Sequence, residues 1–417
     1  YEVLTRNLEE ITRRVGRPLV ITRVADLDVN LAESATGGSA EVTDDAFAVT
    51  RDPEIDIVIE LIGGYGIARE LVLDAIANGK HVVTANKALL AVHGNEIFSA
   101  ANDKGVVVAF EAAVGGGIPI IKALREGLVA NRIEWIAGIV NGTTNFILSE
   151  MRDRGVSFAD ALADAQANGY AEADPTVDIE GVDAAHKLSL MAAIAFGVPV
   201  YFEHVYTEGI TSIEGVDIRY AERLGYRLKL LAITIRREAG IELRVHPCLV
   251  PEDVLIANVE GVMNAVLVQA DAVGPTLYYG AGAGSQPTAS AVIADLVDVA
   301  RLISADPGER VPHLAFQADQ LSDTPVLPMD EVQTSYYLRM RLADEPGVLA
   351  DVTRIFADES ISIDAALQQE PGKESAADFV VLTHLTTERA IRAAIAAIEA
   401  LPTTHSDVVL LRMEKLS

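Results

Sequence analysis

One acidic stretch, running into a helix, holds the residue types best suited to chemistry in this chain. Residues 169–190 read GYAEADPTVDIEGVDAAHKLSL, where several carboxylates precede Asp183 and Lys187. An acid and a base four residues apart share one face of a helix, and most such pairs are solvated and worth about a few tenths of a kcal/mol. The same pair on a buried face would instead indicate a reaction centre. Whether the face that carries Asp183 and Lys187 is exposed or buried therefore decides between the two interpretations.

A helical wheel favours the second reading. At about 100° per residue, Asp183 and Lys187 fall on the side that carries the large apolar side chains of this helix, and small residues fall opposite. The apolar side holds Leu190, Met191 and Ile194, and the opposite side holds Ala185, Ser189 and Ala193. A lysine among apolar side chains must be paired, and burial moves its pKa towards values useful for proton transfer. The preceding acids either bind a substrate ammonium or form a hydrophilic turn.

Composition narrows the class of protein. The chain has 417 residues, enough for two or three domains, and half of them are hydrophobic. The net charge of −28 argues against binding to nucleic acids or anionic membranes. A single cysteine, Cys248, excludes an internal disulfide, and no apolar run reaches the length of a membrane span. No secretory signal is visible, so we predict a cytoplasmic protein.

Short apolar runs alternate with helical patterns in the first part of the chain. This pattern predicts an α/β fold with a doubly wound parallel sheet covered on both faces. The expected strands are Leu19–Asp26, Ile55–Ile62, His81–Ala85 and Gly105–Phe110, and the expected helices cover residues 3–15, 67–78 and 95–103.

The phosphate-binding turn that usually opens such a sheet is missing from the sequence. No G-x-G-x-x-G follows a first strand, and residue 1 already lies in a helical pattern without a capping residue. We interpret the missing piece as the first strand and its turn. The alternative is a doubly wound domain built without that turn.

The rest of the chain divides into three parts. The first part, residues 118–284, mixes strands and helices, and the helix that follows it at Ala289–Ile303 is expected to pack with the first domain. The second part, residues 319–335, has the composition of a proline-containing linker. The last part has the order βαββαβ of a ferredoxin-like unit. Its elements are expected at Tyr336–Leu342, Gly347–Ala357, Ile361–Gln369, Asp378–Leu385, Glu388–Ala400 and Asp407–Met413.

The acidic stretch resembles the signature of the homoserine dehydrogenase family, G-Y-x-E-x-D-P-x-x-D-x-x-G-x-D-x-x-x-K. Four further segments are similar to that family: VVTANKALLA, FEAAVGGGIPII, GIVNGTTNFIL and GAGAGSQPTASAV. The last part resembles an ACT domain in DEPGVLADV and ISIDAALQQ. The resemblance implies a Rossmann-like dinucleotide-binding domain of residues 1–117 and 285–318, a substrate-binding and dimerisation domain of residues 118–284, and an ACT regulatory domain of residues 336–417.

The resemblance implies NAD(P)H-dependent reduction of L-aspartate 4-semialdehyde to L-homoserine, on the route to threonine, methionine and isoleucine. Lys187 matches the proton donor to the carbonyl oxygen, and Asp183 matches the carboxylate that orients substrate and supports this lysine. Lys87 matches a catalytic lysine near cofactor and substrate, although a lysine at a strand end is otherwise an ordinary solvated residue. Glu172 and Asp178 match acidic substrate-site positions, with Glu172 expected at the substrate amino group.

The resemblance also implies a cofactor site and a cation site. The cofactor positions are Gly63, Thr84, Lys87 and Gly284 at strand ends, with Asp26 placed for the ribose hydroxyls of NAD rather than the phosphate of NADP. The cation site combines one carboxylate with three backbone carbonyls, a set that suits sodium. Its members are Glu111, Val114, Gly116 and Ile118, and the alternative reading of this segment is a glycine-rich hinge.

In the ACT domain, the resemblance implies an amino-acid effector such as threonine at Asp344, Gly347 and Gln368, and a homodimer or homotetramer. Two other functions stay open. One is a catalytically impaired protein that still senses an amino acid, which the missing turn favours. The other is an ACT-bearing 2-hydroxyacid dehydrogenase, whose His/Arg/Glu set we do not find in the sequence.

Overall fold

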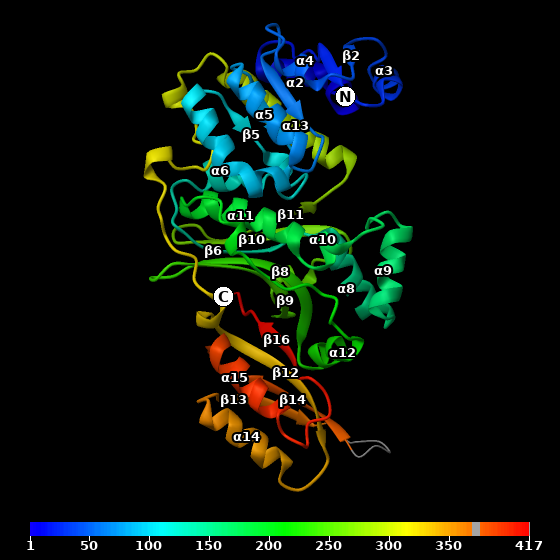
Figure 1. Cartoon of the computed structure of the whole chain (residues 1–417), viewed down its shortest axis with the longest axis vertical. Helices are drawn as coiled ribbons and strands as arrows, with labels where there is room; N and C mark the ends of the chain where they lie inside the picture. Colours follow the sequence, from blue (N-terminus) through cyan, green and yellow to red (C-terminus); the bar gives the residue numbers. More distant parts are fainter. Residues whose placement is uncertain (369–375, 417) are drawn as a thin grey trace. The chain divides into compact units, whose positions relative to one another are not determined.

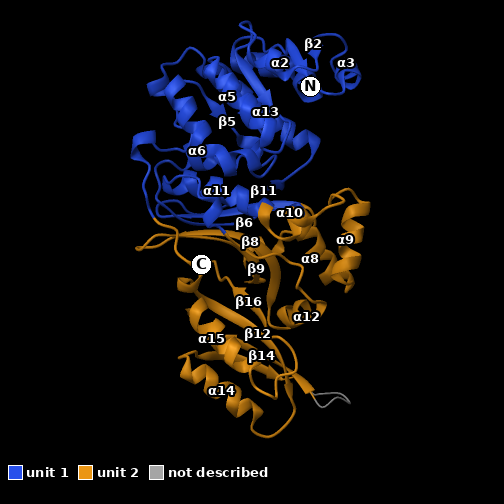
Figure 2. Cartoon of the chain, viewed as in Figure 1, with its two compact units in different colours: residues 1–142, 183–205, 263–324 blue, residues 143–182, 206–262, 325–417 orange. Residues whose placement is uncertain are grey.

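The structure is a computed structural model that describes residues 1–368 and 376–416, and it divides into two compact units (Figure 1, Figure 2). The first unit contains residues 1–142, 183–205 and 263–324, and the second contains residues 143–182, 206–262 and 325–417. The expected domain limits follow sequence patterns rather than packing, and they stay predictions. Gln369, at the end of one expected strand, lies outside the described residues.

Two parallel sheets form the first part of the first unit and confirm the α/β fold class. Strand β1 pairs with β2, and β3, β4 and β5 pair in that order. Each of the first four strands leads into an α-helix. The strands are β1 (Arg23–Ala25), β2 (Glu41–Thr43), β3 (Ile57–Glu60), β4 (His81–Thr84) and β5 (Val108–Ala109), and the helices are α3 (Val29–Thr36), α4 (Ala46–Thr50), α5 (Gly66–Ala77) and α6 (Lys87–Lys104).

Several of the expected elements differ from those observed, among them the strand expected at residues 105–110, which shortens to β5. The helix expected from residue 95 begins at Lys87, because the side chain of Asn86 accepts a hydrogen bond from the backbone N–H of Leu89 and caps it. The single N-terminal helix is two helices, α1 (Glu2–Arg6) and α2 (Leu8–Val15), which meet at Asn7. The strand expected at residues 19–26 shortens to β1.

The N-terminal helices pack against the helix that returns to this unit. Leu4 of α1 and Ile11 of α2 form a buried cluster with Val297 of α13 (Ser285–Leu302). This contact between the two ends of the unit accounts for the apolar spacing in the first sixteen residues.

The remainder of the first unit has three antiparallel strands and a buried helix. The strands lie in the order β11, β10, β6. They are β6 (Ile133–Ile139), β10 (Met263–Ala270) and β11 (Gly274–Ala281), and the helix is α11 (Val182–Phe196).

The second unit has one sheet with the order β8, β9, β16, β12, β14, β13. The last four strands and two helices have the βαββαβ order, which confirms the ferredoxin-like ACT fold. These elements are β12 (Gln333–Ala343), α14 (Val348–Asp358), β13 (Ile363–Gln368), β14 (Ala376–Thr383), α15 (Glu388–Glu399) and β16 (Val409–Met413). The others are α8 (Gly142–Arg154), α9 (Phe158–Ala167), α10 (Thr176–Ile179), β7 (Tyr206–Thr207), α12 (Gly215–Arg223), β8 (Tyr226–Arg236), β9 (Ile241–Pro251) and β15 (Thr386–Thr387).

Within the part of the chain that the structure describes, no helix has both the length and the apolar character needed to cross a membrane.

Candidate active site

The helix α11, which carries Asp183 and Lys187, is buried on all sides. Every residue from Asp183 to Phe196 is buried, including the small residues that the wheel placed opposite the apolar side. The wheel said nothing about whether the side of the small residues meets solvent, and the structure shows that it is buried as well, because a helix enclosed by protein has no solvent face. The inference that Lys187 is buried holds, since this residue is 8% exposed.

Lys187 is held by two acceptors. Its Nζ donates to Oδ2 of Asp183 at 2.7 Å and to the backbone carbonyl of Val140 at 2.6 Å. An ammonium group has three N–H bonds, so these two contacts leave one for an acceptor such as a substrate oxygen. The geometry therefore fixes the lysine while keeping it able to donate a proton.

Asp183 is the centre of this cluster. Its Oδ1 lies 3.1 Å from Nζ of Lys87, and its Oδ2 also accepts a hydrogen bond of 2.9 Å from the side chain of Asn141. Burial by itself raises the pKa of Asp183, but the charges of the two lysines and the hydrogen bonds outweigh burial and hold this pKa well below its ordinary value. The carboxylate is therefore ionised, and its one negative charge is shared between the two lysines that it contacts.

Three segments distant in the chain thus meet at one carboxylate. The structure brings together the three predicted catalytic residues, Asp183, Lys187 and Lys87, whose roles stay predictions. Sequence reasoning missed Asn141 and the carbonyl of Val140. A signal for both was present, because they lie in the GIVNGTTNFIL segment, which the resemblance had already marked.

Lys87 begins α6 at the carboxyl end of β4, next to the predicted cofactor residues. The hydroxyl of Thr84 donates to the buried carboxylate of Glu60 at 2.6 Å, and the backbone N–H of Gly63 donates to the same group at 3.2 Å. Glu60 thereby joins the ends of β3 and β4. Gly63 has a φ of +83°, and a Cβ added there would meet nothing within 4 Å, so the backbone leaves room for a ligand. This edge of a parallel sheet is where a dinucleotide binds in doubly wound folds.

Asp26 and Gly284 are the two other predicted cofactor positions. Asp26 is exposed directly after β1, and its carboxylate accepts from the backbone N–H of Asp28 at 2.9 Å. Gly284 precedes α13 with a φ of +116°, a conformation that favours glycine. Both lie in the first unit, and their roles in cofactor binding stay predictions.

Asp178 and Glu172, the two predicted substrate carboxylates besides Asp183, lie in the second unit. Oδ2 of Asp178 accepts a hydrogen bond of 3.3 Å from the hydroxyl of Thr143, which also donates to the carbonyl of Tyr170 at 2.6 Å. Thr143, near the start of α8, therefore ties the two ends of the acidic stretch together. Glu172 is exposed between them.

Asp174 in the same stretch has a local role. Its carboxylate accepts from both the backbone N–H and the hydroxyl of Thr176, at the start of α10. The turn-forming reading therefore accounts for Asp174.

Glu111, the carboxylate of the predicted cation site, already has backbone partners. Its two oxygens accept from the backbone N–H groups of Ile121 and Lys122, each at 2.8 Å. The carbonyl of Ile118 likewise accepts from Ile120 at 2.8 Å. Gly116 lies against the chain, because a Cβ added there would be 2.4 Å from the carbonyl oxygen of Gly282. Local structure accounts for these contacts, and the cation site stays a prediction.

The predicted effector residues lie at the start of α14 in the ACT domain. Gly347 has a φ of +99° immediately before this helix, and Nε2 of Gln368 donates to Oδ1 of Asp344 at 3.3 Å. The structure therefore brings Asp344 and Gln368 together beside the turn, although their role in effector binding stays a prediction.

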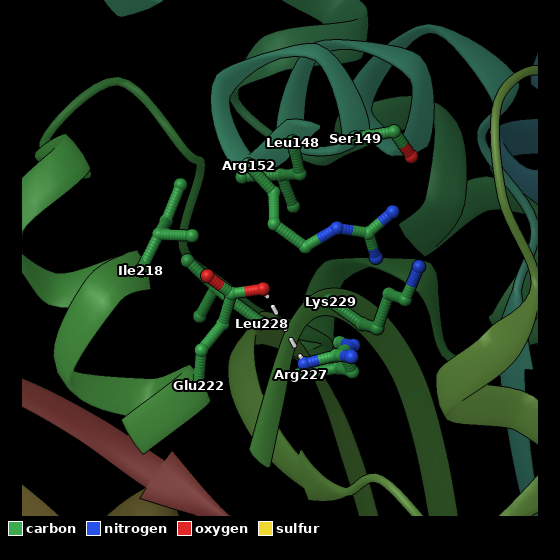
Figure 3. A pocket seen from close by; sticks show the side chains of 8 residues that line it. All are labelled: Leu148, Ser149, Arg152, Ile218, Glu222, Arg227, Leu228 and Lys229. Atoms are coloured by element: carbon green, nitrogen blue, oxygen red, sulfur yellow. Dashed lines mark hydrogen bonds and ion pairs between the residues drawn. The ribbon is translucent and has the colours of Figure 1, made fainter. Parts of the chain in front are cut away.

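A small pocket in the second unit contains charged side chains that sequence reasoning did not single out (Figure 3). Lys229, whose side chain is 2% exposed, donates to the carbonyl of Val259 at 2.6 Å and lies 3.4 Å from Glu260. Arg152 also contacts Glu260, and Arg227 contacts Glu222. The pocket is lined by Leu148, Ser149, Arg152, Ile218, Glu222, Arg227, Leu228 and Lys229. Since acids pair with its cations, the pocket is a structural junction between α8, α12 and β8.

Lys229 should make stability depend on pH. Burial lowers the pKa of Lys229 from 10.5 to about 8. Between pH 8 and pH 10.5 the unfolded chain therefore binds more protons than the folded chain, and the contribution of Lys229 to stability rises with pH. Relative to Lys229→Met, we expect the free energy of unfolding of the unaltered chain to rise by about 3 kcal/mol across this window.

Urea denaturation of both proteins at the two ends of the pH window measures this difference. Lys104→Met, which removes an exposed lysine, serves as the control and should show a difference that is nearly constant with pH. A constant difference for Lys229→Met as well would contradict the prediction.

Three families of known domains match the chain. The family described as "Homoserine dehydrogenase, NAD binding domain" matches residues 2–111, "Homoserine dehydrogenase" matches residues 119–297, and "ACT domain" matches residues 336–403. The first two matches contain the parallel sheets and the Asp183–Lys187 cluster, and the third contains the βαββαβ unit.

Similar proteins cover nearly the whole chain. The homoserine dehydrogenase of Pseudomonas aeruginosa is 58% identical over 100% of this chain and 96% of its own length. That of Neisseria gonorrhoeae is 57% identical over 99% of this chain and 95% of its own length. The solved homoserine dehydrogenase of Thiobacillus denitrificans is 65% identical over 100% of this chain and 95% of that chain, with a TM-score of 0.95. A hyperthermophilic archaeal homoserine dehydrogenase in complex with NADPH is 26% identical over 71% of this chain and 92% of that chain, with a TM-score of 0.60. This chain belongs to the homoserine dehydrogenase family.

Proposed function

We propose that this chain reversibly reduces L-aspartate 4-semialdehyde to L-homoserine with NAD(P)H. The observation that carries the proposal is the buried cluster in which Asp183 contacts both Lys187 and Lys87. Two lysines held at one carboxylate, beside the end of a parallel nucleotide-binding sheet, suit proton transfer to a carbonyl oxygen during hydride transfer.

The reaction adds one hydride to the aldehyde carbon and one proton to its oxygen. A nicotinamide cofactor, when bound, would supply the hydride in this direction and accept it in reverse. Lys187 donates the proton through its remaining N–H, while Asp183 and the Val140 carbonyl hold its Nζ in place. The charges of the two lysines and the hydrogen bonds hold the pKa of Asp183 well below its ordinary value, so Asp183 is ionised and accepts the hydrogen bond from Nζ of Lys187 as a carboxylate.

The substrate's other groups are assigned to the acidic stretch. We propose that Glu172 binds the amino group and that Asp178, positioned by Thr143, adds a second negative charge to the site. An ammonium ion is favoured next to carboxylates, so this pair would select an amino acid over a simple aldehyde.

The cofactor is proposed to bind at the ends of β3 and β4. Gly63 leaves space there, Glu60 fixes the two strand ends together, and Lys87 reaches Asp183 from the same edge. Asp26 favours the ribose hydroxyls of NAD, whereas one solved relative binds NADPH. Sodium near Glu111, a homo-oligomeric state and a cytoplasmic location remain predictions from the sequence.

A direct assay tests the proposed reaction. We expect this chain to oxidise L-homoserine with NAD or NADP, and to reduce L-aspartate 4-semialdehyde with the reduced cofactor. Absence of both activities, together with retained amino-acid binding to the ACT domain, would support the sensing protein instead.

We further propose that the ACT domain binds an inhibitory amino acid, with threonine as the probe. Gln368→Leu removes the hydrogen bond to Asp344 beside the turn at Gly347. We expect the threonine concentration for half inhibition to rise about tenfold, since a lost polar contact to a ligand is worth about 1–2 kcal/mol. Steady-state assays across a threonine series measure this shift. Thr353→Val, which alters an exposed residue of α14, is the matched control. If threonine inhibits the unaltered chain, Gln368→Leu and Thr353→Val equally, Gln368 does not contribute to effector binding.

A further inference from the structure

Arg412 lies where the ACT domain joins the rest of the second unit. It belongs to β16, which pairs with β12 on one side and with β9 on the other (Figure 1). Arg412 faces Cys248 of β9 in the register of these parallel strands. The residue is 0% exposed, so its guanidinium must be balanced by buried partners.

The partners of Arg412 come from two parts of the unit. Two nitrogens of the guanidinium donate to Glu388, the first residue of α15, at 3.0 and 2.6 Å. A third nitrogen donates to Oε2 of Glu208, immediately after β7, at 2.8 Å. The hydroxyl of Tyr206 donates to the same oxygen of Glu208 at 2.9 Å and accepts from Arg412 at 3.2 Å. One buried arginine therefore links a helix of the ACT domain to the 206–208 segment.

This segment continues directly into a tight contact with the acidic stretch. The backbone N–H of Ile210 donates to the carbonyl of Ile179 at 2.8 Å. There is no space for a side chain at Gly209, because an added Cβ would be 2.3 Å from the carbonyl oxygen of Ile179 and 2.6 Å from Cα of Glu180. Ile179 is the last residue of α10 and directly follows Asp178. The position of residues 208–210 therefore sets where α10 can lie.

We propose that Arg412 is a positioning residue for the substrate site. By holding Glu208, it fixes residues 208–210 against α10 and so sets the position of Asp178. The consequence for catalysis rests on the proposed role of Asp178 in binding substrate. The last strand of the ACT domain therefore helps to position the substrate site whether or not an effector is bound. A displacement of α15 would be transmitted to α10 through the contacts of Glu388, Arg412 and Glu208.

Kinetics and amide exchange test the proposal separately. In Arg412→Met we expect the KM for L-homoserine to rise about tenfold, with the cofactor KM within about twofold of the unaltered chain. Hydrogen exchange of peptides covering residues 176–181 and 206–213 should be faster, because the Ile210–Ile179 bond opens more often. Arg392→Met is the matched control: Arg392 also contacts Glu388, but its side chain is 49% exposed and it does not reach Glu208.

Two milder variants keep the test decisive if Arg412→Met fails to fold. Tyr206→Phe removes only the hydroxyl between Arg412 and Glu208, and about a threefold rise in the homoserine KM is expected. Gly209→Ala pushes on Ile179 without altering Arg412, and it should reproduce the full effect on KM and exchange. Gly127→Ala, where an added Cβ meets nothing within 4 Å, is its control.

The outcomes separate this inference from the proposed function. The positioning role is overturned if a folded Arg412→Met shows neither faster hydrogen exchange nor a higher KM for L-homoserine. The same result in both milder variants also overturns it. Equal rises in both KM values also overturn it, since they indicate a general structural defect. An unaltered chain without homoserine activity overturns the proposed function, and the exchange measurement then still decides whether Arg412 holds α10.

Discussion

Lys187→Met is expected to lower kcat for L-homoserine oxidation by about 10²–10⁴-fold, the usual contribution of a positioned acid or base. The variant retains an apolar side chain of similar length in the buried site, and Asp183 keeps its contacts with Lys87 and Asn141. The fold should therefore survive while the proton donor is lost. Stopped-flow and steady-state assays with L-homoserine, together with cofactor titration by fluorescence, measure the two effects separately.

The control for this prediction is Lys104→Met, which removes an exposed lysine at the end of α6. It should have the kcat of the unaltered chain. Cofactor affinity should be nearly unchanged in both variants, because Lys187 contacts only Asp183 and Val140 among the hydrogen bonds described for its Nζ. A change in KM alone would show that Lys187 binds substrate without transferring the proton.

Asp183→Asn is expected to damage both stability and catalysis. The change leaves two lysines facing a neutral amide, one of them buried, and removing one partner of a buried pair costs about 3–5 kcal/mol. Chemical denaturation should therefore show a lower free energy of unfolding. The kcat should fall by about a hundredfold or more, because Lys187 loses the acceptor that holds its Nζ.

The pH dependence of this stability difference has a definite sign. The pKa of Asp183 in the folded protein lies below its ordinary value of 3.8, so its stabilising contribution is present above that value. The contribution is lost as the pH falls through the folded pKa, and the gap between the unaltered chain and Asp183→Asn should narrow on acidification. Asp298→Asn, which breaks a partly exposed pair with Lys122, is the control and should cost less than about 1 kcal/mol.

Local patterns were the most predictable part of this protein. Asp183 and Lys187 are four residues apart, so helical geometry by itself predicts that they meet, and the apolar neighbours of Lys187 indicate burial. The βαββαβ order of the last part and the α/β fold of the first part also follow from apolar periodicity. Element ends were less predictable, as at Lys87, where a capping asparagine extends a helix beyond its periodic residues.

Burial of the whole of α11 was less predictable than burial of Lys187. The helical wheel placed the small residues Ala185 and Ser189 opposite the large apolar side chains, and the structure shows that both sides of the helix are buried. Small residues occur on solvent-facing and on closely packed surfaces alike, so their pattern does not tell the two apart. Only the elements that surround the helix decide whether its second side meets water.

The sequence by itself determined which residues could do the chemistry: an acid–lysine pair in a family signature, a parallel sheet to bind a dinucleotide, and an ACT domain. Tertiary structure decided which partners these residues have. Lys87 and Asn141 reach Asp183 from separate segments, and Arg412 reaches Glu208 across the second unit. Such contacts depend on long-range packing and the burial of charge, which no local spacing encodes, whereas helical and strand periodicity are properties of neighbouring residues.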